Sequence, residues 1–483
     1  MKTKNISLIL IALLSFSLVI SSCKKDKTET PVPVTVVKPK AYVQNWIYSN
    51  MQYWYYWTSN LPAKPDTTLQ PDPFFYSLLY RAPDGDRFSW IEPDYTILIN
   101  QLNGVNKEAG YDFRLYLETG SATNVIGQIT YIKKGSPAQA AGIKRGDIFS
   151  EINSTQLTTV NYRTLLNAAG SNYTLRVKRY DSDLKTLVTD QVYTLNPVEL
   201  AENPVLLDTI YAYSGRKVGY LVYNFFSPGL ANSKVYDNEV DAVFAKFKSG
   251  GVNEVVLDLR FNGGGAISSA INLASLLVPA YNPSKIFVNF QYNSQVQSDI
   301  IKEPTLGPAY LVQKFVSKAS NIGDNLTRLF VLTSKGTASA SELIINGLKP
   351  YMNVVVVGDT TYGKNVGSIT LTDKQNTTNT WGLQPIVLKL TNSLGFSDYT
   401  RGFAPDPNNY DPDNHFYLRP LGDVREPLLS KALNVITGGT VKSAQIQQTM
   451  AGKGIRGANL LSPYKTTMYL SPELSPVKKL HVR

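Results

Sequence analysis

The second half of the sequence predicts an α/β fold with a mostly parallel sheet. Apolar segments of strand length alternate with segments of helical periodicity from about residue 205 onward. Continuous apolar strands separated by helices are typical of a parallel sheet that is covered on both faces. The predicted strands are 218–223, 255–259, 328–334 and 354–357, and the predicted helices are 238–251, 267–278 and 341–349.

Composition excludes several classes of function. The chain has 483 residues, of which 43% are hydrophobic and 18% charged, and this globular composition fits about two to four domains. The two histidines are poorly placed for a Ser-His-Asp triad, because His415 lies in the turn-like DPDNHFY and His481 is close to the C-terminus. A single cysteine excludes internal disulfides and cysteine-rich zinc sites. The net charge of +11 is spread along the chain without a basic run among aromatics, so we expect no nucleic-acid partner.

Residues 1–22 have the pattern of a targeting segment. Two lysines precede an apolar run from Ile6 to Ile20 that is short for a transmembrane span. The run ends in ISSC, which resembles the bacterial lipobox and implies cleavage before Cys23 and diacylation of its sulfur. We therefore expect a lipid-anchored protein of the bacterial cell envelope, on the outer membrane, with residues 23–40 as an extended tether. The alternative is an ordinary signal peptide with an incidental cysteine.

Residues 41–103 predict a small N-terminal helical domain. Its opening segment, AYVQNWIYSNMQYWYYWTSNL, places large aromatic residues largely at helical spacing. These residues are Tyr42, Trp46, Tyr53, Trp54 and Trp57. We interpret them as the buried face of a helix, and the alternative is an aromatic platform for a sugar or a peptide.

Residues 104–200 contain a motif of a second kind. The segment GSPAQAAGIKRGDIFSEINSTQL at 135–157 resembles the central motif of PDZ domains. PDZ domains bind the C-termini of other chains by adding them as a strand to a sheet edge, while backbone N–H groups of a loop hold the terminal carboxylate. The resemblance implies that this loop is Gly110, Tyr111, Asp112 and Phe113. The alternative is a PDZ fold that serves as a rigid spacer.

Three loops follow strands of the predicted parallel sheet: Arg260–Gly265, Ser334–Ser339 and Asp359–Lys364. Because sites form at the carboxyl ends of parallel strands, we expect these loops to converge. Ser339 begins a helix, where unpaired N–H groups and the positive helix end favour developing negative charge. Lys364 follows four valines and a turn, and a partly apolar pocket would lower the pKa of its ammonium until it can accept a proton.

The glycine-rich loop FNGGG at 261–265 allows close approach of backbone N–H groups to a substrate. The N–H of Gly264 or Gly265, with that of Ala340, could form an oxyanion hole. The local alternative for Ser339 is a helix cap, because Ser339-Ala-Ser-Glu342 has the spacing of a capping box.

The segment 358–365, GDTTYGKN, nearly matches a phosphate-binding loop. However, Asn365 replaces the hydroxyl that would hold Mg²⁺, and the following VGSITLT alternates like a strand where a phosphate loop needs a helix N-terminus. We therefore expect no nucleotide partner.

The combination of motifs resembles the C-terminal processing peptidases, also called tail-specific proteases. It comprises GTASASE at 336–342, YGK ending at Lys364, LDLRFNGGG at 257–265 and GFAPD at 402–406. The resemblance implies a ClpP/crotonase-like α/β protease core, here residues 201–440, with an inserted PDZ domain. It further implies Ser339 as nucleophile, Lys364 as general base, oxyanion donors at Gly264, Gly265 and Ala340, and a PDZ domain that captures a substrate tail and helps to gate the site.

The sequence departs from the family pattern after the lysine. The family often has Lys-Gly-x-x-Gln, where the glutamine orients the lysine, whereas this chain has Ser368 at the glutamine position. Ser368 is therefore the candidate lysine-orienting residue. The Tyr/Asn/Gln-rich stretch 283–327 could form a lid or line a specificity pocket, and no role is predicted for the C-terminal tail, residues 441–483.

The sequence therefore predicts a serine endopeptidase with a Ser–Lys dyad. Its partner would be a protein or peptide substrate with a C-terminal tail, and the mechanism would need no metal and no cofactor. The alternative is a catalytically silent peptide- or glycan-binding surface lipoprotein that keeps the same fold.

Overall fold

The computed structural model describes residues 41–167, 170–181, 186–411, 415–439 and 463–480. The predicted signal peptide, Cys23 and the tether to residue 40 lie outside the described residues. The chain divides into two compact units, Met1–Tyr42 and Val43–Arg483, and all the described strands belong to the second unit. Among the described helices, none combines the length and the apolar character needed to cross a membrane.

The peptidase-like half, which comprises the predicted core of residues 201–440, is built on a five-stranded sheet in the order β10-β11-β12-β16-β17. Strands β11, β12, β16 and β17 pair in parallel, and β10 pairs antiparallel with β11 at one edge. The prediction of a mostly parallel sheet is therefore confirmed. The bounds are β10 (Val205–Tyr213), β11 (Arg216–Tyr223), β12 (Glu254–Asp258), β16 (Arg328–Thr333) and β17 (Asn353–Gly358).

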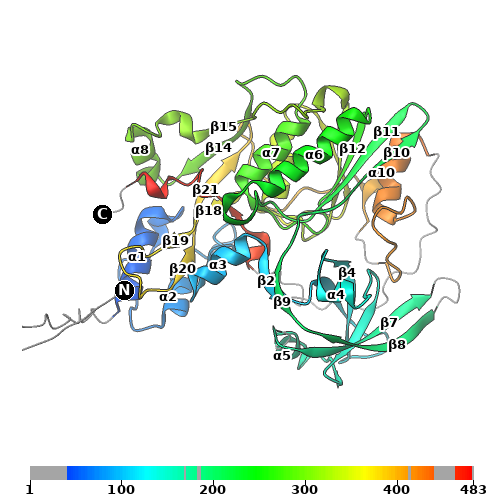
Figure 1. Cartoon of the computed structure of the whole chain (residues 1–483). Helices are drawn as coiled ribbons and strands as arrows, with labels where there is room; N and C mark the ends of the chain where they lie inside the picture. The colour runs from blue at the N-terminus through cyan, green and yellow to red at the C-terminus, as the bar shows by residue number, and fades with distance from the viewer. Residues whose placement is uncertain (1–40, 168–169, 182–185, 412–414, 440–462, 481–483) are drawn as a thin grey trace, which may run out of the picture. The chain divides into compact units, whose positions relative to one another are not determined.

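Helices cover both faces of this sheet (Figure 1). Alternate side chains of each strand join different apolar clusters, as in β16, where Leu329 and Val331 face one cluster and Phe330 and Leu332 face the other. The first cluster includes α6 (Val235–Ser249), α7 (Ile267–Leu277) and α9 (Ala340–Leu348), and the second includes α10 (Pro427–Thr437). Burial on both faces explains why the strands are apolar without alternation.

A second, six-stranded sheet has the order β13-β22-β18-β21-β14-β15. The stretch 283–327 supplies β14, β15 and α8, so it is part of this sheet and its cover. The bounds are β13 (Gly265–Ala266), β14 (Ile286–Tyr292), α8 (Ser294–Lys302), β15 (Val312–Lys314), β18 (Val366–Ser368), β21 (Ile386–Thr391) and β22 (Met468–Tyr469).

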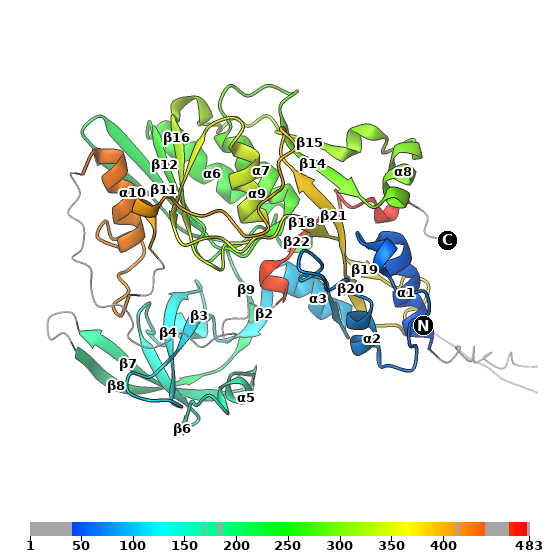
Figure 2. The ribbon, with the colours of Figure 1, turned by 180° about the vertical axis from the view of Figure 1, so that it is seen from behind.

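The C-terminal residues 463–480 are not a separate tail, which corrects the boundary expected at residue 441. Strand β22 lies between β13 and β18, and Met468 and Leu470 are buried in the main apolar cluster. Figure 2 shows β22 beside β18, far in sequence from the strands that flank it. Local pattern could not predict this pairing, because a two-residue strand has no periodicity.

The N-terminal region is largely helical, as predicted, but it shares its core with the peptidase-like half. Trp54 is fully buried in the main cluster, and Trp46, Tyr53 and Trp57 pack against that cluster, so the aromatic face is a packing surface. Strand β1 pairs antiparallel with β20, which in turn pairs with β19. The bounds are α1 (Tyr42–Trp54), α2 (Pro71–Ser77), β1 (Trp90–Glu92), α3 (Tyr95–Leu102), β19 (Leu371–Thr372) and β20 (Gly382–Gln384).

The PDZ-like region has its own sheet and its own apolar cluster, which includes Phe149. The chain enters and leaves it through an antiparallel pair, β2 (Val105–Glu108) with β9 (Val198–Ala201), as expected for an inserted domain. The other bounds are β3 (Tyr111–Leu117), β4 (Val125–Ile132), α4 (Pro137–Ala140), β5 (Ile148–Ile152), β6 (Thr155–Gln156), α5 (Tyr162–Asn167), β7 (Tyr173–Asp181) and β8 (Thr186–Leu195).

Candidate active site

Ser339 is the residue immediately before α9 and has an unusual backbone conformation, with φ 66° and ψ −117°. A positive φ at a residue other than glycine is strained, and such strain is concentrated at functional sites. Ser339 and Glu342 have the arrangement of a capping box, yet the buried Oγ makes no hydrogen bond of normal geometry with any residue that the structure describes. A buried hydroxyl without a partner costs about 1–3 kcal/mol. The capping role explains the position of Glu342, whereas the unpartnered hydroxyl suits a nucleophile that is held ready.

Glu342 ties the serine loop to the lysine loop. Its Oε2 accepts hydrogen bonds from the backbone N–H of Ser339 and of Lys364, both at 2.8 Å. Its Oε1 accepts from the Thr361 hydroxyl and the Gly363 N–H, both at 2.6 Å. Burial raises the pKa of Glu342 to about 7, although these four hydrogen bonds work against the shift. The capping-box spacing identified Glu342 in the sequence, but only the fold shows that its carboxylate also holds the lysine loop.

Lys364 is buried, in keeping with its position after an apolar strand. Burial lowers the pKa of its ammonium to about 7, and the negative charges of Asp86 and Glu342 offset part of this shift. Its Nζ donates a hydrogen bond to the carbonyl oxygen of Thr466 at 2.9 Å and lies 4.9 Å from the ring centroid of Phe88. A large fraction of Lys364 is therefore neutral near pH 7 and able to accept a proton.

Asp86 is a site residue that no motif in the sequence indicates. It is buried in the N-terminal region, where its Oδ1 accepts from the N–H groups of Phe88 and Ser89 at 2.8 and 2.9 Å. Asp86 is the first of the two carboxylates that favour the charged form of Lys364. No local signal marks it, because Asp86 and Lys364 are brought together only by the packing of the N-terminal region on the core.

The glycine-rich loop lies against Ser339. A Cβ atom added to Gly264 would lie 2.6 Å from the Cβ and 2.9 Å from the Oγ of Ser339. The two loops are also joined by the Ser341 hydroxyl, which donates to the Asn262 carbonyl at 3.0 Å. The N–H of Gly264, one predicted oxyanion donor, donates instead to the Asn262 side chain at 2.9 Å. Of the predicted donors, the N–H of Ala340, the first residue of α9, therefore remains the strongest candidate, because Gly265 is paired with Met468 of β22.

Ser368, the predicted lysine-orienting residue, has other partners. Its hydroxyl donates to the carbonyl oxygen of Met468 and accepts from the Gln384 side chain, both at 2.9 Å. Ser368 thus holds strand β22 in place, and the atom that receives the Lys364 hydrogen bond is a backbone oxygen of the segment leading into β22. Lys364 is therefore hydrogen-bonded to the Thr466 backbone in place of Ser368, and the sequence pattern could not identify this partner.

The PDZ region presents a sheet edge where a peptide could add. Strand β3 is at the end of its sheet and, among the described strands, pairs with β4 alone. The loop that is predicted to hold a substrate's terminal carboxylate begins just before β3 and continues into it. In this loop, the Phe113 N–H donates a hydrogen bond to the Asp112 side chain at 2.8 Å. Asp112 also forms an ion pair of 3.2 Å with Lys465. Burial acts to raise the pKa of Asp112, but the neighbouring Lys465 and Lys133 ammonium groups outweigh it and lower the pKa.

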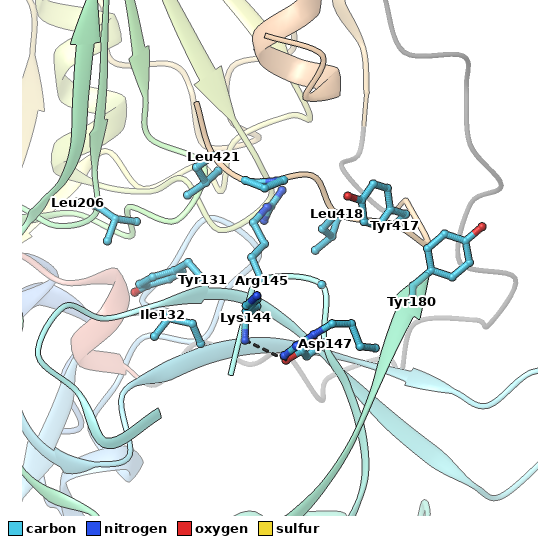
Figure 3. A pocket seen from close by; sticks show the side chains of 13 residues that line it. Tyr131, Ile132, Lys144, Arg145, Asp147, Tyr180, Leu206, Tyr417, Leu418 and Leu421 are labelled. Atoms are coloured by element: carbon cyan, nitrogen blue, oxygen red, sulfur yellow. Dashed lines mark hydrogen bonds and ion pairs between the residues drawn. The ribbon is translucent and has the colours of Figure 1, made fainter. Parts of the chain in front are cut away.

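A pocket lies where the PDZ region meets residues 417–421 (Figure 3). Arg145 extends into it and donates to the carbonyl oxygens of Arg419 and Thr130, at 2.9 and 2.7 Å. None of the predicted site residues lines this pocket. Its contacts join the PDZ motif GIKRGD to the chain segment that precedes α10.

Comparison with known proteins identifies the same three regions. Residues 217–406 match the model of peptidase family S41, residues 42–90 match the peptidase S41 N-terminal domain, and residues 128–179 match the PDZ domain. Each match lies inside the corresponding predicted domain. Fold and sequence together thus define a PDZ-containing serine peptidase architecture.

Two parts of the chain, residues 42–90 and residues 217–406, thus match peptidase family S41. It is 25% identical over 274 residues to the chloroplastic C-terminal processing peptidase of Tetradesmus obliquus, covering 55% of this chain and 52% of that protein. It is 29% identical over 240 residues to a carboxyl-terminal-processing protease of Picosynechococcus, covering 48% and 49%. The aligned part thus spans about half the length of these curated relatives.

One solved structure is similar over most of the chain. It is a Bacteroides fragilis protein crystallised as a candidate S41 protease, with a TM-score of 0.67 and 29% sequence identity. The match covers 81% of this chain and 97% of that one. The similarity is therefore not confined to the peptidase core.

Proposed function

We propose that this chain is a serine endopeptidase in which Ser339 is the nucleophile and Lys364 the general base. One observation carries the proposal: a buried lysine with a lowered pKa and a strained serine with a free hydroxyl are held by the same oxygen of Glu342. The match of residues 217–406 to peptidase family S41 supports the same chemistry.

In the proposed mechanism, neutral Lys364 takes the proton of Ser339 as Oγ attacks the carbonyl carbon of the scissile peptide bond. Backbone N–H groups of Ala340 and of the glycine-rich loop stabilise the oxyanion, and the protonated lysine then donates to the leaving amine. A water molecule attacks the acyl-enzyme, again with Lys364 as base. The hydrogen bond from Lys364 Nζ to the Thr466 carbonyl uses one N–H of the amine, so the lone pair of neutral Lys364 is still available to accept the Ser339 proton.

We further propose that the PDZ domain selects substrates by their C-terminal tails. Support comes from the edge position of β3 and from the adjacent loop of Gly110, Tyr111, Asp112 and Phe113. A tail added to β3 would gain main-chain hydrogen bonds along the strand. Because Asp112 repels a carboxylate, its ion pair with Lys465 bears directly on whether the loop can receive one.

The test is cleavage of an unstructured reporter protein with an apolar C-terminal tail by the chain from residue 24. We expect turnover by the parent and at least a 1000-fold loss, on the order of what removal of a nucleophile or its base costs, in Ser339→Ala and in Lys364→Ala. Moving the apolar tail away from the reporter's C-terminus should raise KM. Full activity of Lys364→Ala would rule out the assignment of the base.

A peptide-binding protein without turnover is the second candidate. The specific observation in its favour is that Lys364 is hydrogen-bonded to Thr466, while Ser368, at the position of the family's glutamine, contacts other groups. A fluorophosphonate probe distinguishes the two, because covalent labelling of Ser339 requires an activated hydroxyl. Saturable tail binding with neither labelling nor turnover would establish this second function.

We also propose that Cys23 carries the lipid anchor and that the protein belongs to the bacterial cell envelope, at the outer membrane. The support is the ISSC motif and the placement of the single cysteine of the chain within it. In cells, Cys23→Ser should move the protein from the membrane fraction to the soluble fraction and remove the mass of the acyl chains. A membrane-bound Cys23→Ser variant of unchanged mass would contradict this proposal.

A further inference from the structure

The C-terminal segment 465–471 lies across the proposed catalytic site as an inserted strand. Within it, β22 pairs in parallel with β13, which continues the glycine-rich loop, and with β18, which follows Lys364. The Leu470 N–H donates to the Ser368 carbonyl at 3.0 Å, and the Ser368 hydroxyl donates to the Met468 carbonyl at 2.9 Å. Strand pairing on both sides is how an extended peptide is held between two strands, and the Ser368 side chain adds a contact to the backbone of the segment.

Two carbonyl groups of this segment face the groups that would act on a substrate. The Lys465 carbonyl oxygen lies so close to Gly263 that a Cβ there would be 1.7 Å from it. The next carbonyl, of Thr466, accepts the hydrogen bond from Lys364 Nζ at 2.9 Å. Peptide carbonyls therefore contact both the glycine-rich loop and the general base while Ser339 is fully buried.

The same segment is joined to the PDZ region. Lys465 forms an ion pair of 3.2 Å with Asp112, in the loop where the carboxylate of a substrate tail is expected. Both side chains are partly buried, with exposed fractions of 34% and 26%. Lys465 thus links the proposed tail-binding loop to the proposed catalytic site, since the carbonyl that holds Lys364 belongs to the next residue.

We propose that the slot between β13 and β18 is a binding site for an extended peptide, and that the chain's own segment 465–471 occupies it as a competitor of the substrate. The ion pair of Lys465 with Asp112 is the latch that favours the occupied state. The contacts alone support the slot and its occupation by segment 465–471. That this segment competes with a substrate rests on the proposed peptidase function.

Thiol accessibility tests the proposal without relying on catalysis. The chain from residue 24 contains no cysteine, so Ser339→Cys gives a single reporter thiol in the site. We expect slow reaction of this thiol with a small maleimide, and a reaction about five- to tenfold faster after Lys465→Glu, which replaces an attraction with a repulsion. The charge-swapped pair Asp112→Lys with Lys465→Glu should return the rate to that of the parent.

Two controls isolate the latch. Lys479→Glu makes the same charge change on an exposed residue of the same C-terminal region and should leave the labelling rate unchanged. Asp112→Asn opens the latch without altering the segment, which covers the case in which Lys465→Glu does not fold. A synthetic peptide with the sequence of residues 463–475 should slow labelling of the opened variants.

The outcomes separate this proposal from the peptidase assignment. Equal labelling rates in the parent, Lys465→Glu and Asp112→Asn, with all three folded by thermal melting, would overturn the proposal, as would rapid labelling of the parent. Faster labelling together with faster reporter cleavage in the Ser339 background supports both. Faster labelling without any cleavage supports the occupied slot and refutes the peptidase.

Discussion

Glu342 offers the sharpest test of how the site is assembled. Its carboxylate accepts four hydrogen bonds, from the N–H groups of Ser339, Gly363 and Lys364 and from the Thr361 hydroxyl. In Glu342→Gln, an amide oxygen replaces one carboxylate oxygen and an NH₂ group replaces the other. The favourable orientation keeps the oxygen toward Ser339 and Lys364, because the Thr361 hydroxyl can rotate and accept from the NH₂ group.

The loss of stability and of kcat in each variant depends on how many of the four hydrogen bonds it loses. One donor, the Gly363 N–H, is left without an acceptor in Glu342→Gln, and a buried unsatisfied donor costs about 1–3 kcal/mol. Glu342→Ala removes all four acceptor contacts and leaves a cavity, so we expect a loss of about 3–5 kcal/mol in the free energy of unfolding. Because Ser339 and Lys364 lose their shared support only in Glu342→Ala, kcat should fall about 100-fold there and less than about tenfold in Glu342→Gln.

The assay combines urea unfolding with reporter cleavage. Glu199→Ala is a control, since Glu199 is an exposed glutamate of the β2–β9 pair, and it should change neither quantity measurably. Equal activity and stability of the parent and Glu342→Ala would show that the four hydrogen bonds do not support the site. Equal losses of kcat in the glutamine and alanine variants would show that the charge of Glu342, and not its backbone contacts, matters.

The pKa values of the site and its close glycine contact lead to three more expectations. Because the pKa of Lys364 is lowered to about 7, kcat/KM should rise with pH through about 7 and level off above it. A flat profile between about pH 5 and pH 9 would contradict the role of Lys364 as base. Because burial raises the pKa of Glu342 from its ordinary 4.5 to about 7, the folded state binds the proton more tightly than the unfolded state, so this group's contribution to stability is present below pH 4.5 and lost as the pH rises through 7. In urea unfolding, the free energy of the parent minus that of Glu342→Gln should therefore fall between pH 4.5 and pH 7, and a constant difference would contradict the raised pKa. Gly264→Ala should lower kcat about 100-fold or more, since the new Cβ would meet Ser339 at 2.6 Å and φ is +120°, and parental kcat in this variant would place the glycine-rich loop outside the reaction.

Several features were predictable because they are local. The strands of the parallel sheet are apolar runs because they are buried on both faces, and each predicted strand and helix between residues 218 and 357 is observed with different ends only. Strands β14 and β15 and helix α8, in the stretch 283–327, were not predicted. The loops that carry Gly264, Ser339 and Lys364 could be paired from the sequence because each follows a parallel strand of that sheet. The PDZ-like motif likewise carries its own turn residues and core positions.

Short-range pattern and motif spacing encode the α/β core, the PDZ insertion and the candidate nucleophile, base and glycine-rich loop, so all of these could be read from the sequence. What surrounds those groups depends instead on long-range packing. Thr466, whose carbonyl holds Lys364, lies 102 residues further along the chain, and Asp86 belongs to the N-terminal region. Their approach to Lys364 requires the packing of that region on the core and a two-residue strand near the C-terminus, and neither leaves a periodic signal in the sequence.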